Sequence, residues 1–185
     1  MGMGKSQTAR LFAEEGVPVF DADAAIHALY EGPAATLIEA AFPGTVRDGR
    51  VDRGLLAARV AGDAAALARL EGLMHPLVAE ARDAFVEAAG NAPILLLDIP
   101  LLLETGIAVD AVVVASAPAS VQRQRVLARP GMNEAKFAAL SARQMSDAQK
   151  RQQADYVVMT DKGLEDARAQ VKMILAAIRA KLSNA

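Results

Sequence analysis

The chain of 185 residues contains no cysteine and no tryptophan, and only 4% of its residues are aromatic. Without cysteine it can have no disulfide, no thiolate nucleophile and no cysteine-based zinc site. The scarcity of aromatic side chains argues against the stacking platforms that bind single-stranded nucleic acid. The formal net charge of −2 argues the same way, because proteins that bind a phosphate backbone usually carry a basic surplus. We therefore expect no nucleic-acid partner.

Long apolar runs are also absent. No stretch of about 18 apolar residues and no signal peptide is present, so we expect a cytoplasmic protein without a membrane partner. The two histidines, His27 and His75, are far apart in sequence and give no zinc-ligand spacing. Hydrophobic residues make up 53% of the chain, and its length fits one α/β domain with a helical insertion, as a monomer or weak homo-oligomer.

The amino-terminal segment MGMGKSQT carries the clearest chemical signal. Gly4-Lys5-Ser6 matches the last three positions of the phosphate-binding loop pattern G-x-x-x-x-G-K-[ST]. In such a loop the backbone N–H groups surround a phosphate, the lysine reaches the β- and γ-phosphates, and the serine hydroxyl binds Mg²⁺. The tripeptide alone is equally compatible with an ordinary polar helix start. The first glycine of the pattern would lie two positions before Met1.

The residues that follow favour the phosphate loop. Residues 8–15 have the pattern of an amphipathic helix, Gly16 is typical of a helix end, and residues 17–20 (VPVF) are typical of a short strand. A loop, a helix and a strand in this order are part of a βαβ unit.

The rest of the chain alternates in the same way. We expect further strands at 93–98, 110–115 and 155–160, and helices at 24–31, 34–42, 52–61, 63–73, 76–89, 118–129, 133–152 and 164–182. This alternation predicts an α/β protein whose parallel sheet has helices on both faces. The long helical block between the first two strands predicts a lobe beside the sheet.

Carboxylates follow two of these strands, where ligands bind in open α/β folds. Asp21 and Asp23 follow the first strand, and an extended Asp-x-Asp would turn both side chains to one side. One of them would accept the proton of an acceptor hydroxyl, although Asp23 is also compatible with a helix N-cap. Asp98, at the end of strand 93–98, is placed either to bind the water shell of Mg²⁺ or to cap a loop. His75-Pro76 is expected to begin the helix at 76–89.

The stretch QRQRVLAR (122–129) and the basic residues after it predict a lid, at about 123–152, that closes over transferring phosphates. A solvent-exposed charged face is the other interpretation. The break at Pro130-Gly131 favours the lid, with Arg125 and Arg129 as the arginines that reach phosphate.

Taken together, these segments resemble the dephospho-CoA kinases over nearly the whole chain. The matching pieces are GMGKS (2–6), VPVFDAD (17–23) with His27, DR (52–53), HPLV (75–78), PLLLETG (100–106), QRQRVLAR (122–129), Gln144 and ADYVVMTDKG (154–163). The resemblance implies a P-loop kinase fold, a helical acceptor-binding lobe at 24–90 and a lid. It implies transfer of the γ-phosphate of ATP to the ribose 3′-hydroxyl of dephospho-CoA, the last step of coenzyme A synthesis.

The resemblance also implies roles for individual residues. Asp23 would be the base, with Lys5 and Arg129 as further catalytic residues, and Ser6 would hold Mg²⁺. Asp98, from its place at a strand end, is the second residue expected to hold the metal. The residues expected to bind ATP are Gly2, Met3, Gly4, Lys5, Ser6, Gln7, Thr8, Arg125, Thr160 and Gly163. Those expected to bind the acceptor are Asp21, His75, Pro100 and Leu101.

Three alternatives remain at this point: another small-metabolite kinase of the same fold, a nucleotide-binding remnant with little or no activity, and a reading frame that starts upstream of Met1. The last would supply the strand and the first glycine that the phosphate-loop pattern requires. We expect that strand to be central in the sheet and needed for full activity.

Overall fold

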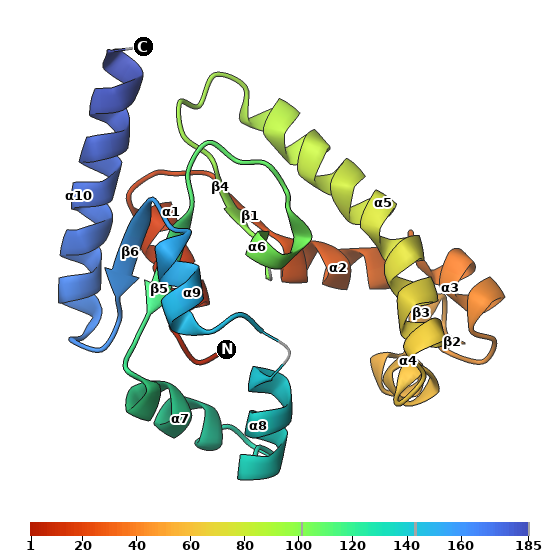
Figure 1. The fold of residues 1–185 in the computed structure, drawn as a ribbon. Coiled ribbons are helices and arrows are strands. Elements are labelled where there is room, and N and C mark those ends of the chain that lie inside the picture. Colours follow the sequence, from red (N-terminus) through yellow and green to blue (C-terminus); the bar gives the residue numbers. More distant parts are fainter. Residues whose placement is uncertain (101, 143, 185) are drawn as a thin grey trace. The chain divides into compact units, whose positions relative to one another are not determined.

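The computed structural model describes residues 1–100, 102–142 and 144–184, without the side chains of Glu104 and Thr105. The chain forms two compact units (Figure 1). The first unit consists of Met1–Val19 and Ala92–Ala185, and the second of Phe20–Asn91. Among the described residues, every helix is either too short or too polar to cross a membrane.

The first unit is built from helices around short strands. Its elements are α1 (Lys5–Glu14), β4 (Leu96–Asp98), α6 (Leu102–Thr105), β5 (Val113–Ser116), α7 (Ala119–Leu127), α8 (Glu134–Ser141), α9 (Asp147–Gln152), β6 (Tyr156–Met159) and α10 (Leu164–Ser183). Strands β5 and β6 pair in parallel, with Val113 opposite Tyr156 and Ser116 opposite Met159. The amino-terminal part of this unit ends at Val19, the first residue of β1 (Val19–Asp21), and the amide of Leu96 in β4 donates to the carbonyl of Pro18 at 2.9 Å.

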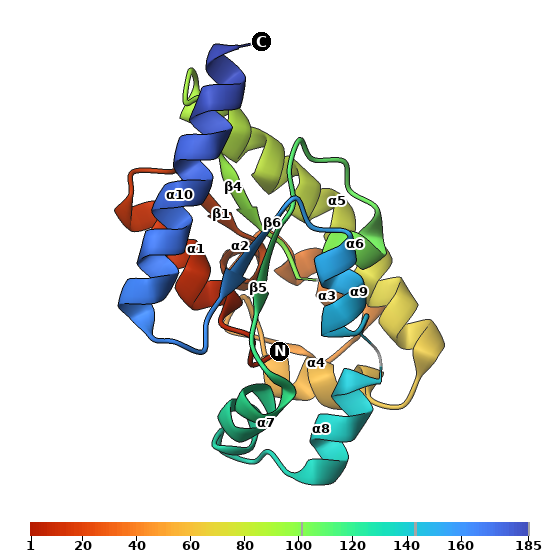
Figure 2. The same ribbon diagram turned by 60° about the vertical axis from the view of Figure 1, so that its left-hand side comes forward.

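The core of the first unit lies between α1, α10 and the strands. Helix α10 packs against both α1 and β6 (Figures 1 and 2). The apolar stripe of each helix supplies the fully buried side chains, with Leu11 and Phe12 from α1 and Val171 and Leu175 from α10. Val158 of β6 is completely buried among them. This packing fixes α1, and the glycine segment directly before it, against the ends of the strands.

The second unit is helical apart from one small hairpin. Its elements are α2 (Ala22–Tyr30), α3 (Ala35–Ala41), β2 (Val46–Arg47), β3 (Arg50–Val51), α4 (Arg53–Val60) and α5 (Ala64–Ala89). Its own core gathers Ile38, Phe42, Leu56, Leu70 and Met74.

The structure corrects several expected boundaries in the second unit. The helices expected at 63–73 and 76–89 are one continuous helix, α5, with Pro76 inside it. His75 therefore does not precede a helix start. Proline removes one backbone hydrogen bond, but Leu70 and Met74 anchor the helix to the core on the amino-terminal side of the proline. The turn-rich segment at 42–51 contains the antiparallel hairpin of β2 and β3.

In the first unit, by contrast, one expected helix is divided into two. The single helix expected at 133–152 is two helices, α8 and α9. Ser146 begins α9 with a capping box, in which its hydroxyl accepts the amide of Gln149 and the Gln149 side chain accepts the amide of Ser146. This local hydrogen bonding competes with a continuous helix. The four expected strands are present but shorter, and α6 had no clear signal in the sequence.

Candidate active site

The glycine segment directly before α1 adopts a conformation that requires glycine. Gly2 and Gly4 have φ angles of 73° and 90°, in the left-handed region that side chains disfavour. A Cβ atom on Gly2 would lie 2.6 Å from a Val126 methyl group, and one on Gly4 would lie 2.9 Å from a Thr160 methyl group. Both glycines are thus required by backbone conformation and by close packing. Gly4 is also the N-cap of α1, so the positive end of the helix dipole lies at this segment.

The side chains of Lys5 and Asp98 form an ion pair. Lys5 is the first residue of α1, and Asp98 ends β4. The carboxylate of Asp98 is buried, whereas the side chain of Lys5 is 45% exposed. The structure therefore joins the two residues from which the sequence predicted phosphate and magnesium contacts. Ser6 is exposed on the first turn of α1.

Most residues expected to bind ATP line one pocket of the first unit. The pocket is lined by Gly2, Gly4, Gln7, Thr8, Leu11, Arg125, Arg129, Thr160, Gly163, Leu164 and Ala167. Seven of the ten expected residues are in that list, together with Arg129. Met3 and Lys5 line a neighbouring groove instead, and Ser6 lines neither. Residues 125–129 and 160–167, far away in sequence, thus meet the segment of residues 2–11 at this pocket.

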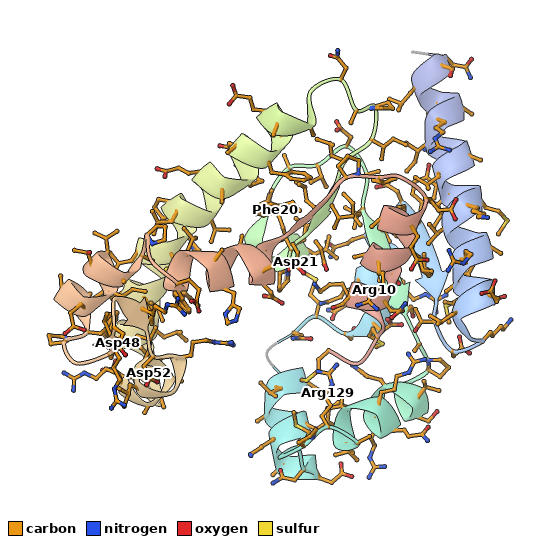
Figure 3. The ribbon with its side chains drawn as sticks, turned by 180° about the vertical axis from the view of Figure 1, so that it is seen from behind. Arg10, Phe20, Asp21, Asp48, Asp52 and Arg129 are labelled. Atoms are coloured by element: carbon orange, nitrogen blue, oxygen red, sulfur yellow. The ribbon has the colours of Figure 1, made fainter. Side chains whose placement is uncertain are left out.

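The surroundings of this segment are positively charged. Burial lowers the pKa of the Met1 amine, and the nearby charges of Lys150, Arg129 and Lys5 lower it further. Arg129 lies just past the end of α7 and is exposed (Figure 3). A site with cations gathered around free backbone amides attracts an anion.

Arg125 and Arg129 have different environments although both line the pocket. The guanidinium of Arg125 donates from Nη1 to Thr160 Oγ1 at 2.9 Å and from Nη2 to the Thr160 carbonyl. The side chain of Arg129 forms no hydrogen bond or ion pair with the residues that the structure describes. Of the two arginines, Arg129 is therefore the one available to a ligand.

Sequence reasoning missed the role of Gln122. Its amide Nε2 donates to the Met1 carbonyl at 2.9 Å, and Val126, one turn later on α7, packs under Gly2. Both views of the ribbon place the amino terminus next to α7 (Figures 1 and 2). The i, i+4 spacing of these residues was the available signal, because it puts both on one helix face.

Two of the four residues predicted to bind the acceptor, Asp21 and His75, lie in the second unit. Asp21, and not Asp23, is the N-cap of α2, and its carboxylate accepts the amide of Ala24 at 3.0 Å (Figure 3). The expectation of an extended Asp-x-Asp is wrong, because Asp23 lies in the first helical turn, where its side chain is exposed. His75 is exposed within α5, Pro100 follows β4 in the first unit, and Leu101 lies outside the described residues.

His27 and Arg53, which the family resemblance named in separate sequence pieces, are neighbours in the structure. Arg53 Nη1 lies 3.4 Å from His27 Nδ1, and both belong to the second unit. The carboxylate of Asp52 accepts the amides of Gly54 and Leu55 and so begins α4 (Figure 3). The cap therefore fixes Arg53 at the first position of its helix.

The family model described as dephospho-CoA kinase matches residues 1–166. The chain belongs to the dephospho-CoA kinase family. Members of this family are ATP-dependent phosphotransferases, so the chain is an enzyme of that class.

Relatives named dephospho-CoA kinase support this assignment over nearly the full chain. The one from Mesorhizobium japonicum is 59% identical and aligns with 97% of this chain and 93% of its own. Those from Bradyrhizobium diazoefficiens and Brucella melitensis are 57% and 51% identical, over 96% and 98% of this chain and 92% of each relative.

Solved structures confirm the predicted P-loop kinase fold. A protein from Thermus thermophilus, 33% identical, superimposes with a TM-score of 0.82 over 96% of this chain and 93% of its own. The dephospho-CoA kinase from Campylobacter jejuni is 21% identical and has a TM-score of 0.66 over 95% and 91% of the two chains. At that identity the second structure supports the fold alone.

Proposed function

We propose that the chain transfers the γ-phosphate of ATP to the ribose 3′-hydroxyl of dephospho-CoA, the last step of coenzyme A synthesis. The observation that carries this proposal is the pocket in which Gly2, Gly4 and Gln7 meet Arg129 and Thr160. Membership of the dephospho-CoA kinase family supplies the acceptor.

Phosphoryl transfer needs positioning and charge stabilisation more than covalent help from the protein. Backbone amides at the start of α1 would hold the phosphates, and the ammonium of Lys5 would stabilise charge that develops on the transferred group. Arg129, which forms no ion pair within the described chain, would add a second positive charge. Of the predicted lid at about 123–152, α7 and α8 pack against each other.

The residues present fit a magnesium ion that is held jointly with the nucleotide. Ser6 and Asp98 offer a hydroxyl and a carboxylate oxygen, the donor type that Mg²⁺ prefers. In the described part of the chain there is no group of three or more acidic or histidine side chains that could hold a metal without other ligands. This agrees with an ion that takes most of its ligands from phosphate and water. Bound in this way, Mg²⁺ would neutralise charge on the phosphates.

Asp23 is the proposed base toward the acceptor hydroxyl. Its carboxylate is exposed and forms no hydrogen bond or ion pair with other described residues, so it is available to accept a proton. We assign the helical lobe at 24–90, with Asp21 and His75, to acceptor binding, together with Pro100 and Leu101.

Asp23→Asn tests the base. We expect turnover, measured as ADP formation with dephospho-CoA and ATP, to fall roughly 10²- to 10⁴-fold. ATP binding should be retained, because Asp23 lies outside the nucleotide pocket. Asp48→Asn in the hairpin turn is the matched control: Asp48 has a φ of 50°, which asparagine tolerates equally well. Unchanged turnover in the Asp23 variant would remove its role as base.

A panel of acceptors tests the substrate. Dephospho-CoA should be phosphorylated in preference to adenosine, to nucleoside monophosphates and to pantetheine derivatives that lack the nucleotide. A chain that binds ATP but phosphorylates none of them would instead be the nucleotide-binding remnant.

A further inference from the structure

Two carbonyl groups of the glycine segment are held by side chains from distant elements. The hydroxyl of Thr160 donates to the Met3 carbonyl at 2.8 Å, and the Gln122 amide donates to the Met1 carbonyl at 2.9 Å. These are the carbonyls of the peptide groups that end in Gly4 and Gly2. The two polar contacts thus alternate with the two glycines along the segment.

Holding these carbonyls also fixes the direction of the following amides. The peptide bonds here are trans and planar, so the C=O and N–H of one peptide group point in opposite directions. With the Met3 oxygen turned to Thr160, the Gly4 N–H is turned away from Thr160. By the same geometry, the Gly2 N–H is turned away from Gln122. Within the described chain neither amide donates to a protein acceptor.

Thr160 is itself fixed from three directions. Its amide donates to the carbonyl of Ser116 at 2.9 Å, which extends the pairing of β5 and β6 by one residue. The guanidinium of Arg125 holds both its hydroxyl and its carbonyl oxygen. Because Arg125 donates to Oγ1, the hydroxyl hydrogen of Thr160 is left to donate. Its two acceptors are the Met3 carbonyl at 2.8 Å and the Ser116 carbonyl at 3.3 Å, and the shorter distance favours Met3.

We propose that Thr160 and Gln122 are positioning residues of the nucleotide site, which aim the amides of Gly4 and Gly2 at the phosphates by holding the preceding carbonyls. This proposal rests on the proposed function for the identity of the anion. Arg125 acts through Thr160 and not by contact with phosphate.

The test separates phosphate binding from adenosine binding. Inorganic tripolyphosphate and adenosine are titrated separately by calorimetry against the full chain, so that no acceptor and no turnover are needed. Thr160→Val keeps the shape of the side chain and its methyl contact with Gly4 but removes the hydroxyl. We expect this variant to bind tripolyphosphate roughly three- to tenfold more weakly, since one hydrogen bond is lost. Its affinity for adenosine should change less than about twofold, well within the effect of one hydrogen bond.

Matched variants complete the test. Thr160→Ser, which keeps the hydroxyl and loses the methyl group, should bind tripolyphosphate nearly as well as the wild type. Gln122→Leu should behave as Thr160→Val does. Arg123→Gln is the control on the same helix, because Arg123 pairs with Glu134 and lines no part of the pocket. Melting temperatures of all variants identify any general loss of folding.

Several results would overturn the proposal. These are equal losses for adenosine and tripolyphosphate, no loss in Thr160→Val, failure of Thr160→Ser to restore binding, and no tripolyphosphate binding by the wild type. A wild-type chain that binds tripolyphosphate but does not phosphorylate dephospho-CoA would refute the proposed function alone.

Discussion

The two members of the Lys5–Asp98 ion pair differ in burial. Asp98 has a buried carboxylate, and Lys5, its ion-pair partner, is 45% exposed. Water can therefore solvate the ammonium of Lys5 without Asp98, but it has little access to the carboxylate. Removing the partner of Asp98 should therefore cost more stability than removing the partner of Lys5.

Lys5→Met should destabilise the chain more than Asp98→Asn, by about 1–2 kcal/mol in the free energy of unfolding. The first change leaves a buried carboxylate without a counter-charge, whereas the second leaves an ammonium in water. Urea unfolding at pH 7 without nucleotide measures both, and the double variant should recover part of the loss. Equal losses in the two single variants would contradict this account.

Glu39 gives the chain a pH-dependent contact. Its carboxylate accepts the amide of Gly44 at 2.8 Å and that of Val46 at 2.9 Å. These hydrogen bonds, that of Gly44 foremost, lower the pKa of Glu39 below its ordinary value of 4.5. A lowered pKa means that the contact stabilises the fold above pH 4.5 and is lost as the pH falls through the folded-state value.

The Glu39→Gln variant isolates this effect. Its free energy of unfolding should be lower than that of the wild type at pH 7, and the difference should shrink steadily below about pH 4.5. Other carboxylates titrate equally in both proteins, so they cancel in the comparison. Denaturant titrations at several pH values measure the difference, and a difference that stays constant with pH would count against the assigned contact.

At the scale of elements, the sequence predicted where helices and strands lie better than where they end. The alternation that predicted a parallel α/β fold is confirmed, because apolar periodicity extends over whole elements. The predicted helix boundary at Pro76 was wrong, although a proline normally marks the end of a helix. Here core contacts of residues before Pro76 stabilise the helix, which continues past the proline. The extended conformation expected for Asp21 and Asp23 was also wrong about an element boundary. The strand ends at Asp21 and α2 begins at the next residue, so Asp23 is helical.

Replacing Pro76 by alanine should stabilise α5. Pro76 is exposed, so its ring contributes little packing, and it leaves the carbonyl of Gly72 without its helical partner. Pro76→Ala should raise the free energy of unfolding by about 1–3 kcal/mol and increase the helical signal in circular dichroism. The control Ala79→Pro, one turn later in the same helix, should destabilise the chain. An unchanged or lower melting temperature for Pro76→Ala would refute this prediction.

The candidate site could be predicted only in part, because its assembly depends on the whole molecule. Gly4 and Lys5 were recognisable from a local motif and Arg125 from its basic stretch, whereas Gly2 and Thr160 were recognisable from their place in the family resemblance. The spacing of Gln122 and Val126 puts both on one helix face, but it does not indicate that Gln122 holds a carbonyl more than a hundred residues away, and nothing local to Thr160 indicates this either. Such contacts arise when α7 and β6 pack beside the glycine segment, which sequence periodicity does not encode.

A groove beside α1 in the first unit has the shape of a strand site. It lies between α1, β4 and β5 and is lined by residues 96–98 and 112–115, with Phe12 and Met1 among the apolar side chains. One edge of β4 bonds to Pro18 through the amide of Leu96, and one edge of β5 pairs with β6. Among the described strands of the first unit, neither β4 nor β5 has a partner on its other edge. The buried hydroxyl of Thr8 also lines the groove and has no hydrogen-bond partner within the described chain.

A variant with about five apolar, β-branched residues and a glycine turn placed ahead of Met1 should fill this groove. The added strand would hydrogen-bond to β4 on one side and β5 on the other, and it would bury apolar surface against Phe12. It would also remove the cost of a charged amine at Met1, whose pKa burial already lowers. We expect the melting temperature to rise by at least about 5 °C and ATP to bind more tightly, because the peptide groups before Gly2 become fixed.

A segment of equal length made of glycine, serine and aspartate is the control, since it supplies backbone but little apolar surface or strand propensity. If both extensions raise the melting temperature equally, or neither does, the groove is not a strand site.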